Sequence, residues 1–180
     1  MLSSLPQVPA PVLSRIERAV SHARQDLEAL LALSRGGGAT AASPQRLDQL
    51  LPEIAALHLD AHANAATRLH WDVAGPVERA VAPGPLSIVF GNVLRNALRA
   101  AAGGEIRIHV SPEAVRVSDN GPGFPAQVIE AQASPRPGLR SDGGGSGMGL
   151  YIAQVLARRE GWRLDLGAAE GGGASVELRF

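Results

Sequence analysis

From residue 43 to the C-terminus, segments with the two-residue periodicity of strands alternate with apolar helical segments, and turns rich in glycine and proline separate them. Helices are predicted at 49–65, 86–102, 126–132 and 149–159. Strands are predicted at 45–48, 67–73, 77–82, 105–110, 114–118, 162–166 and 174–180. Because the last four strands form two hairpins, this order favours a two-layer α+β sandwich.

Residues 12–35 are predicted to form one long helix with a narrow apolar seam. The seam residues follow one another at spacings of 3, 4, 3, 4 and 3, and they are Leu13, Ile16, Val20, Ala23, Leu27 and Leu30. This rhythm is typical of a coiled coil or helical bundle. A lone helix cannot bury such a seam, so we infer that it pairs with a second copy of the chain or with a segment outside this sequence. The glycines at 36–38 are predicted to form a hinge, which divides the chain into regions 1–43 and 44–180.

The composition argues against several classes of protein. Seventeen arginines balance seventeen acidic residues at a pI near 7.0, whereas a duplex nucleic-acid binder normally carries a basic excess. The absence of cysteine excludes disulfides, thiolate metal sites and cysteine nucleophiles. No segment has the roughly 18–20 apolar residues of a membrane span, and the N-terminus does not resemble a signal peptide. We therefore expect a cytoplasmic chain, which can still belong to a larger protein.

The first chemical motif, N-x-x-x-N-A-x-R, occupies residues 92–99 of a predicted helix. Asn92 and Asn96 are four residues apart, so they lie on one helix face, and Arg99 lies one turn beyond Asn96. A carboxamide oxygen can ligate Mg²⁺, and a guanidinium can bind phosphate. Alternatively, the two asparagines are capping or surface amides.

The second motif, D-x-G-x-G, occupies residues 119–123 and directly follows a predicted strand. An ionised Asp119 can accept a hydrogen bond from an N–H donor such as an exocyclic amine. Gly121 and Gly123 allow the backbone to pass close beneath a flat ligand. Taken alone, this motif is most often a simple turn.

The third motif is the glycine-rich run at 143–149, directly before a predicted helix. Glycines before a helix N-terminus expose backbone N–H groups, which can bind phosphate. The run is not a dinucleotide-binding fingerprint, because that motif follows the first strand of a βαβ unit. A lysine-containing phosphate loop is excluded as well, since the chain has no lysine.

The order and spacing of these motifs resemble the N, G1 and G2 boxes of the sensor histidine kinase catalytic domain, a member of the Bergerat ATPase superfamily. The resemblance is close over 86–180 and looser over 44–85. It implies the Bergerat fold, in which helices cover one face of a mixed sheet. The helix at 12–35 resembles the second helix of the family's dimerisation and phosphoacceptor hairpin.

The resemblance implies ATP and Mg²⁺ as ligands of the first motif. Asn96 would ligate Mg²⁺, and Asn92 would lie beside the phosphates and the metal. Arg99 corresponds to the family's basic residue that reaches a phosphate. We therefore expect Asn92 and Arg99 to act in catalysis as well as in binding.

The other two motifs would hold the remainder of the nucleotide. Asp119 would accept from the adenine amine, with Gly121 and Gly123 shaping the floor beneath the base. Arg136 and Arg140 are candidate lid residues for the γ-phosphate or, alternatively, solvated loop charges. The triphosphate would be wrapped by Gly145, Ser146, Gly147, Met148, Gly149 and Leu150.

Three departures from the family pattern stand out. Ala100 occupies a position where the family commonly has an aromatic residue near the adenine, so base affinity is expected to be reduced. The segment 130–142 lacks the phenylalanine that helps to dock the family's lid. No H-E-x-x-x-P-like phosphoacceptor motif is present, and His22 lacks the acidic residue and proline that would mark it as the acceptor. The acceptor is therefore expected in a missing helix.

The expected function is transfer of the ATP γ-phosphate to that histidine, and then to an aspartate of a response regulator. We expect the full-length protein to form a homodimer through the N-terminal helix and not to bind nucleic acid. It would contact the membrane only through segments outside this sequence. One alternative is a hydrolytic Bergerat ATPase, but that branch carries a glutamate base where this chain has Asn92. The other alternative is a degenerate, non-catalytic dimerisation module.

The remaining histidines and tryptophans carry weaker signals. His58 and His62 have the spacing of zinc ligands, but no third ligand is evident, so a solvated helix face is favoured. His70 and His109 are expected to be structural. Trp71 and Trp162 are expected to pack, with their N–H groups at the edge.

Overall fold

The computed structural model describes residues 41–62, 67–101, 103–137 and 147–180, with four single residues nearer the N-terminus. Contacts divide the chain into two compact units, Met1–Gly36 and Gly37–Phe180. The four single residues are helical and exposed, and they are Val12, Val20, Leu27 and Leu31. The other positions of the predicted seam lie outside the described residues, and the predicted division between 43 and 44 stays a prediction.

The unit from Gly37 to Phe180 contains two sheets. The helical elements are α2 (Leu47–His62), α3 (Pro83–Ala101), α4 (Ala126–Glu130), the 3₁₀ turn η1 (Ala131–Ala133) and α5 (Met148–Arg159). The strands are β1 (Ser43–Arg46), β2 (Arg68–Val73), β3 (Glu78–Val81), β4 (Glu105–Val110), β5 (Ala114–Asp119), β6 (Arg163–Ala168) and β7 (Ala174–Arg179). The five-stranded sheet has the order β2-β4-β5-β7-β6, and β1 pairs with β3 in a separate antiparallel sheet.

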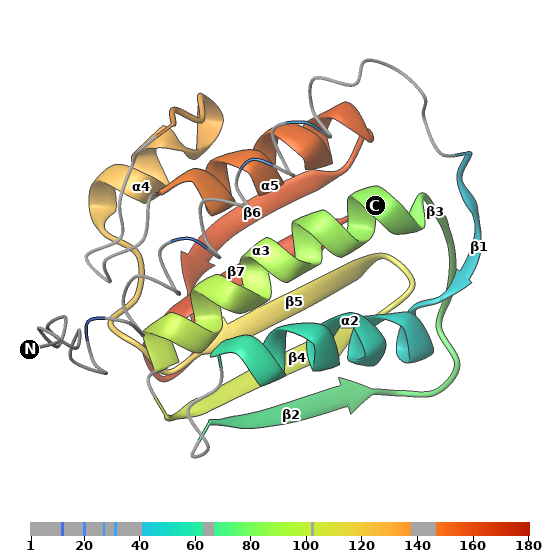
Figure 1. The fold of residues 1–180 in the computed structure, drawn as a ribbon, viewed down its shortest axis with the longest axis horizontal. Coiled ribbons are helices and arrows are strands. Elements are labelled where there is room, and N and C mark those ends of the chain that lie inside the picture. The colour runs from blue at the N-terminus through green and yellow to red at the C-terminus, as the bar shows by residue number, and fades with distance from the viewer. Residues whose placement is uncertain are drawn as a thin grey trace, which may run out of the picture. The chain divides into compact units, whose positions relative to one another are not determined.

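The five-stranded sheet is mixed, since β2 runs parallel to β4 and the other neighbours are antiparallel. Figure 1 shows α2, α3 and α5 in one layer over this sheet. Side chains of β4 alternate strictly between exposed and buried, as expected when only one face of a sheet is covered. The predicted two-layer sandwich, with helices on one face of a mixed sheet, is therefore confirmed.

The core lies between α3 and the sheet. Phe90 and Leu94 of α3 are almost fully buried, as are Ile106 and Ile108 of β4. Trp71 lies beside Phe90, with ring centroids 6.5 Å apart. Trp162 meets the ring of Phe180 edge-on at 5.5 Å. The predicted packing role of both tryptophans is confirmed.

Several predicted boundaries are wrong by two or three residues, and β1 begins at Ser43 rather than at residue 45. Helix α3 begins at Pro83, not at residue 86, because proline suits the first turn of a helix, where its missing N–H is not needed. The N–H of Leu86 already donates to the carbonyl of Ala82, at 3.1 Å. Helix α2 begins at Leu47, two residues before the predicted start, directly after β1.

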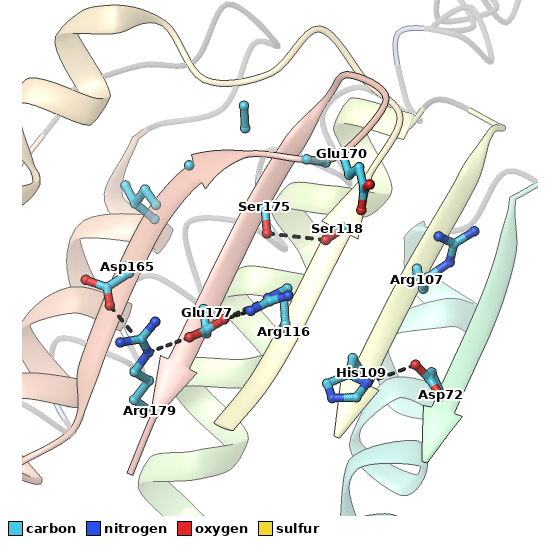
Figure 2. A pocket seen from close by; sticks show the side chains of 14 residues that line it. Asp72, Arg107, His109, Arg116, Ser118, Asp165, Glu170, Ser175, Glu177 and Arg179 are labelled. Atoms are coloured by element: carbon cyan, nitrogen blue, oxygen red, sulfur yellow. Dashed lines mark hydrogen bonds and ion pairs between the residues drawn. The ribbon is translucent and has the colours of Figure 1, made fainter. Parts of the chain in front are cut away.

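The other face of the five-stranded sheet is open and polar (Figure 2). Cross-strand ion pairs join Arg116 to Glu177 and Arg179 to Asp165, and an ion pair along β7 joins Glu177 to Arg179. His109 Nδ1 lies 2.9 Å from the carboxylate of Asp72 on the adjacent strand. Because the charges are paired along this face, the face can remain in contact with water without an apolar cover.

Neither a membrane span nor a metal cluster is found among the described residues. No helix in that part of the chain is long and apolar enough to cross a bilayer. The same residues contain no group of three or more histidine, cysteine, aspartate or glutamate side chains that could hold a metal ion. His58 packs against α3, since a Cβ on Gly91 would lie 2.3 Å from His58 Nε2. This half-buried contact replaces the solvated position expected for His58, and the side chain of His62 lies outside the described residues.

Asp48 ties the start of α2 to the segment before β3. Its Oδ1 accepts a hydrogen bond from the N–H of Val77 at 2.9 Å, and its carboxylate receives two bonds from Arg46 at 2.9 and 2.6 Å. The hydrogen bonds from Arg46 hold the pKa of Asp48 well below the ordinary 3.8. The ionised carboxylate therefore stabilises the folded chain at pH values above the ordinary pKa of 3.8, and this contribution to the stability is lost as the pH falls below that value.

We predict that Asp48→Asn lowers the melting temperature at pH 7, and that the difference from wild type shrinks as the pH falls below about 4. Thermal unfolding followed by circular dichroism between pH 7 and pH 3 measures this. Glu53→Gln is the matched control, because Glu53 is an exposed acid of the same helix. A difference that does not change with pH would contradict the ion-pair account.

Candidate functional site

The three sequence motifs lie on adjoining elements. The first motif is on α3, the second follows β5, and the third leads into α5. Helix α3 packs against both α5 and β5. In Figure 1, α3 lies between α2 and α5 and crosses over β5. The fold thus brings together segments that the sequence separates by about 20 residues or more.

Asn92 lies at the contact between α3 and α5. Its side chain belongs to a residue only 4% exposed, its Nδ2 donates to the carbonyl of Ile88 at 2.9 Å, and its Oδ1 accepts from Arg95. A Cβ at Gly149 would lie 2.8 Å from Asn92 Oδ1, which is closer than such contacts normally come. The first turn of α5 can therefore approach Asn92 only because position 149 is glycine.

Asn96 differs from Asn92, although both lie on the same face of α3. Asn96 is half-buried, and its carboxamide makes no hydrogen bond to any described residue. Its oxygen therefore keeps both lone pairs for a ligand, and a carboxamide oxygen is a hard ligand suited to Mg²⁺. Arg99 lies exposed in the last turn of the helix.

Asp119 ends β5 and is 6% exposed. Its Oδ1 accepts from the N–H of Gly121 at 2.9 Å and from the N–H of Ala174 at 3.4 Å. Burial raises the pKa of Asp119, and these two hydrogen bonds oppose the rise. Within the described part of the chain, its Oδ2 accepts no hydrogen bond, which leaves one oxygen for a donor on a ligand.

The loop after Asp119 is confined on two sides. A Cβ on Gly121 would lie 2.7 Å from the carbonyl oxygen of Ala100, and a Cβ on Gly173 would lie 1.9 Å from the carbonyl oxygen of Asp119. Gly123 and Gly173 both have a positive φ, of +83° and +92°. The β6–β7 turn therefore forms one wall of this loop, and the last turn of α3 forms the other.

Sequence reasoning missed the contribution of Gly173 and the role of Asn120. Gly173 lies in the turn of the last predicted hairpin, and the residue that it contacts, Asp119, lies more than 50 residues away along the chain. Asn120 Oδ1 accepts from the N–H of Glu105 at 3.0 Å, so its side chain stabilises the start of β4. A Cβ on Gly104 would lie 2.2 Å from Asn120 Oδ1, so glycine at position 104 leaves room for this hydrogen bond.

The third motif is described in part. Gly147 has φ +71° and is the N-cap of α5, so glycine is needed there for its left-handed backbone. Met148, Gly149 and Leu150 form the half-buried first turn. Arg136 is exposed in the segment after η1. The remaining predicted residues, Arg140, Gly145 and Ser146, lie outside the described residues.

These features define what the site can bind. It combines an anionic acceptor at the end of β5, a carboxamide on α3 that has no partner among the described residues, and the N-terminus of α5. These groups suit, respectively, an amine donor on a flat base, a hard cation and a phosphate group.

A family model described as "Histidine kinase-, DNA gyrase B-, and HSP90-like ATPase" matches residues 82–180, more than half of the chain. The sensor histidine kinase GtrS of Pseudomonas aeruginosa is 38% identical over 111 residues, which are 58% of this chain and 24% of GtrS. The sensor protein kinase PilS of the same species is 30% identical over 168 residues, which are 86% of this chain and 30% of PilS. The chain thus spans a quarter to a third of the length of these curated relatives.

Solved structures show the same fold. The cytoplasmic segment of the histidine kinase QseC has a TM-score of 0.64 at 21% identity, over 99% of both chains. Full-length ShkA in complex with AMPPNP has a TM-score of 0.68 at 21% identity, over 98% of this chain and 39% of ShkA. The chain therefore belongs to the family of histidine kinase-, DNA gyrase B- and HSP90-like ATPases, and the relatives that it matches are sensor histidine kinases.

Proposed function

We propose that this chain binds Mg-ATP and supplies the γ-phosphate to a histidine on a separate helix of a two-component sensor kinase. The observation that carries the proposal is the carboxylate of Asp119, a residue only 6% exposed, whose Oδ2 accepts no hydrogen bond from the described residues at the end of β5. An ionised carboxylate oxygen that is available in a site accepts a strong hydrogen bond from an N–H donor of a ligand. The adenine amine is such a donor.

Asp119 would orient the base, while glycine keeps the surrounding space open. Gly121 and Gly123 would form the floor, because the chain at these positions carries no side chain between the base and the backbone. Ala100 contacts Gly121 from the other side. Its methyl group offers less apolar surface than an aromatic ring, so we expect the base to be held chiefly by Asp119.

The phosphates would lie between α3 and the start of α5. Asn96 would ligate Mg²⁺ through its carboxamide oxygen, and Arg99 would contact a phosphate. The triphosphate would be held by the start of α5 and the residues that precede it in the sequence. We assign this role to Gly145, Ser146, Gly147, Met148, Gly149 and Leu150. The bound Mg²⁺ would neutralise charge on the phosphate oxygens. Arg136 and Arg140 would contact the γ-phosphate.

Asn92 favours phosphoryl transfer over hydrolysis. A carboxamide cannot accept a proton from water in the way that a glutamate base can. Both polar ends of Asn92 are also engaged, by Ile88 and Arg95. In the proposed transfer, an imidazole nitrogen attacks the γ-phosphorus, a P–N bond forms, the bond to the β–γ bridging oxygen breaks, and ADP leaves.

The partner segments of this reaction lie outside the sequence. We propose that the acceptor histidine lies on another helix of the parent protein, and that a response regulator aspartate then receives the phosphoryl group. Exposed Val20 and Leu27 support pairing of the N-terminal helix with a second copy. A cytoplasmic position is supported by the similarity to the cytoplasmic segment of QseC.

The primary test is calorimetric titration of the 180-residue chain with ATP in the presence and absence of Mg²⁺. Asn96→Ala should abolish the Mg²⁺ dependence, and Asp119→Ala should weaken binding about ten- to a hundredfold, the loss of about 1.5–3 kcal/mol for a charged hydrogen bond. GTP lacks the amine at this position of the purine. Equal binding of GTP and ATP by the wild type would contradict the role of Asp119.

Asp119→Asn should weaken the binding of ATP without lowering the melting temperature of the chain. Because burial raises the pKa of Asp119, its ionisation destabilises the folded chain at neutral pH, and this cost disappears as the pH falls below the ordinary carboxyl value. The variant should therefore melt at the same or a higher temperature than wild type at pH 7, while it binds ATP more weakly. A lower melting temperature together with unchanged ATP affinity would assign Asp119 a purely structural role.

The chain alone should bind Mg-ATP yet show little autophosphorylation, since the acceptor histidine lies outside it. Incubation with radiolabelled ATP, followed by analysis of acid-sensitive label, measures this. His22→Ala should leave the low signal unchanged. Strong labelling that disappears in His22→Ala would contradict the proposal and make His22 the acceptor.

A further inference from the structure

A small cavity lies between the segment after α4 and the start of α5. It measures about 20 Å³, which is room for roughly one water molecule. Three of the predicted nucleotide-binding residues line it, namely Arg136, Gly147 and Leu150. The side chain of Gln154, from the next turn of α5, lines the same cavity. The cavity therefore connects the proposed phosphate site with a residue to which no role has been given.

Gln154 lines this cavity with a carboxamide that forms no hydrogen bond with any residue in the described ranges. The residue is 7% exposed. Its polar atoms are not sealed from water, since the fully buried side-chain polar atom without a partner in the described ranges is Thr67 Oγ1. Helix α5 could carry an apolar residue here, as it does at Ile152 and Leu156. The carboxamide of Gln154 is therefore available to a polar group that enters the cavity.

The segment that carries Arg136 is fixed just before it. Arg158 Nη2 donates to the carbonyls of Gln132 and Ala133, at 2.7 and 3.0 Å. The side-chain Oε1 of Gln132 accepts from the N–H of Leu166 on β6, at 3.0 Å. Figure 1 shows α4 beside α5 and β6, the elements to which these bonds connect. The backbone is therefore held on two sides only three residues before Arg136.

Arg136 itself has no hydrogen bond or ion pair to the described residues. Its guanidinium has five N–H donors, and a γ-phosphate could use only part of them. A carboxamide oxygen is a suitable neutral acceptor for the others, and Gln154 lies along the same cavity.

We propose that Gln154 is a positioning residue for the terminal phosphate, because its carboxamide oxygen accepts from Arg136 when a nucleoside triphosphate is bound. The anchored turn before Arg136 limits the reach of its side chain, and Gln154 fixes its direction. This inference rests on the proposed function, since it assigns Arg136 to the γ-phosphate. It adds a specificity that Asp119 cannot supply, namely discrimination of a triphosphate from a diphosphate.

The test is calorimetric titration of the 180-residue chain with Mg-ATP and with Mg-ADP. Gln154→Met keeps the length of the side chain and removes its hydrogen-bonding groups. It should raise the Kd of ATP about tenfold and leave the Kd of ADP within about twofold. Its melting temperature should stay close to that of wild type, because the carboxamide makes no hydrogen bond to the described residues that the substitution could remove. Gln127→Met is the matched control, since Gln127 is exposed on α4, and it should change neither Kd.

A double-mutant cycle shows whether Gln154 acts through Arg136. If it does, Arg136→Ala combined with Gln154→Met should bind ATP no more weakly than Arg136→Ala alone. Additive losses would contradict the proposal. A lower melting temperature with equal loss of ATP and ADP binding would also contradict it, because a packing role would explain that result. Gln154→Leu repeats the measurement if the methionine variant does not fold.

Failure of this inference can be distinguished from failure of the proposed function. A wild-type chain that binds neither ATP nor ADP would contradict the proposed function and, with it, this inference. A wild-type chain that binds both, with an unchanged ratio of the two Kd values in Gln154→Met, would contradict only the role of Gln154. In that case one water molecule in the cavity would be the partner of the carboxamide.

Discussion

Close packing of backbone around α3 is the constraint on which the rest of this fold depends. Three neighbours reach this helix at positions where a glycine lies on one side of the contact: His58 of α2 at Gly91, Gly121 at Ala100, and Gly149 at Asn92. At each contact a Cβ would come within 3 Å of the other residue. The helix thus serves both as the centre of the core and as a shared wall of the site. A side chain at any of these glycines would push the contacting segment away from the helix.

The elements of the fold that could be predicted are those that leave a local pattern in the sequence. The alternation in residues 105–110 and 114–118 predicts a hairpin, and the structure has β4 and β5 there. The glycines before α5 likewise predict the helix start that Gly147 caps. What could not be predicted depends on distant contacts. Neither the hydrogen bond from Ala174 to Asp119 nor the parallel pairing of β2 with β4 leaves a periodic signal in the sequence.

The missing phenylalanine in segment 130–142 shows how a departure from a family pattern can be offset. The sequence alone suggested weak docking of this segment. In the structure, polar bonds from Arg158 and Gln132 hold its first residues against α5 and β6. These bonds could not be predicted, because glutamine and arginine in helices are usually solvated and their partners here are backbone groups elsewhere in the chain.

The side chain of Gln132 has a consequence for association between molecules. Strand β6 is an edge of the five-stranded sheet, and an edge offers unpaired N–H and C=O groups to the strand of any neighbouring chain. By accepting from the N–H of Leu166, Gln132 occupies one of these groups near the middle of the strand. Two copies of the domain that meet at this edge could otherwise pair strand to strand. Blocking the edge in this way disfavours a continuous sheet between them and favours two separate domains.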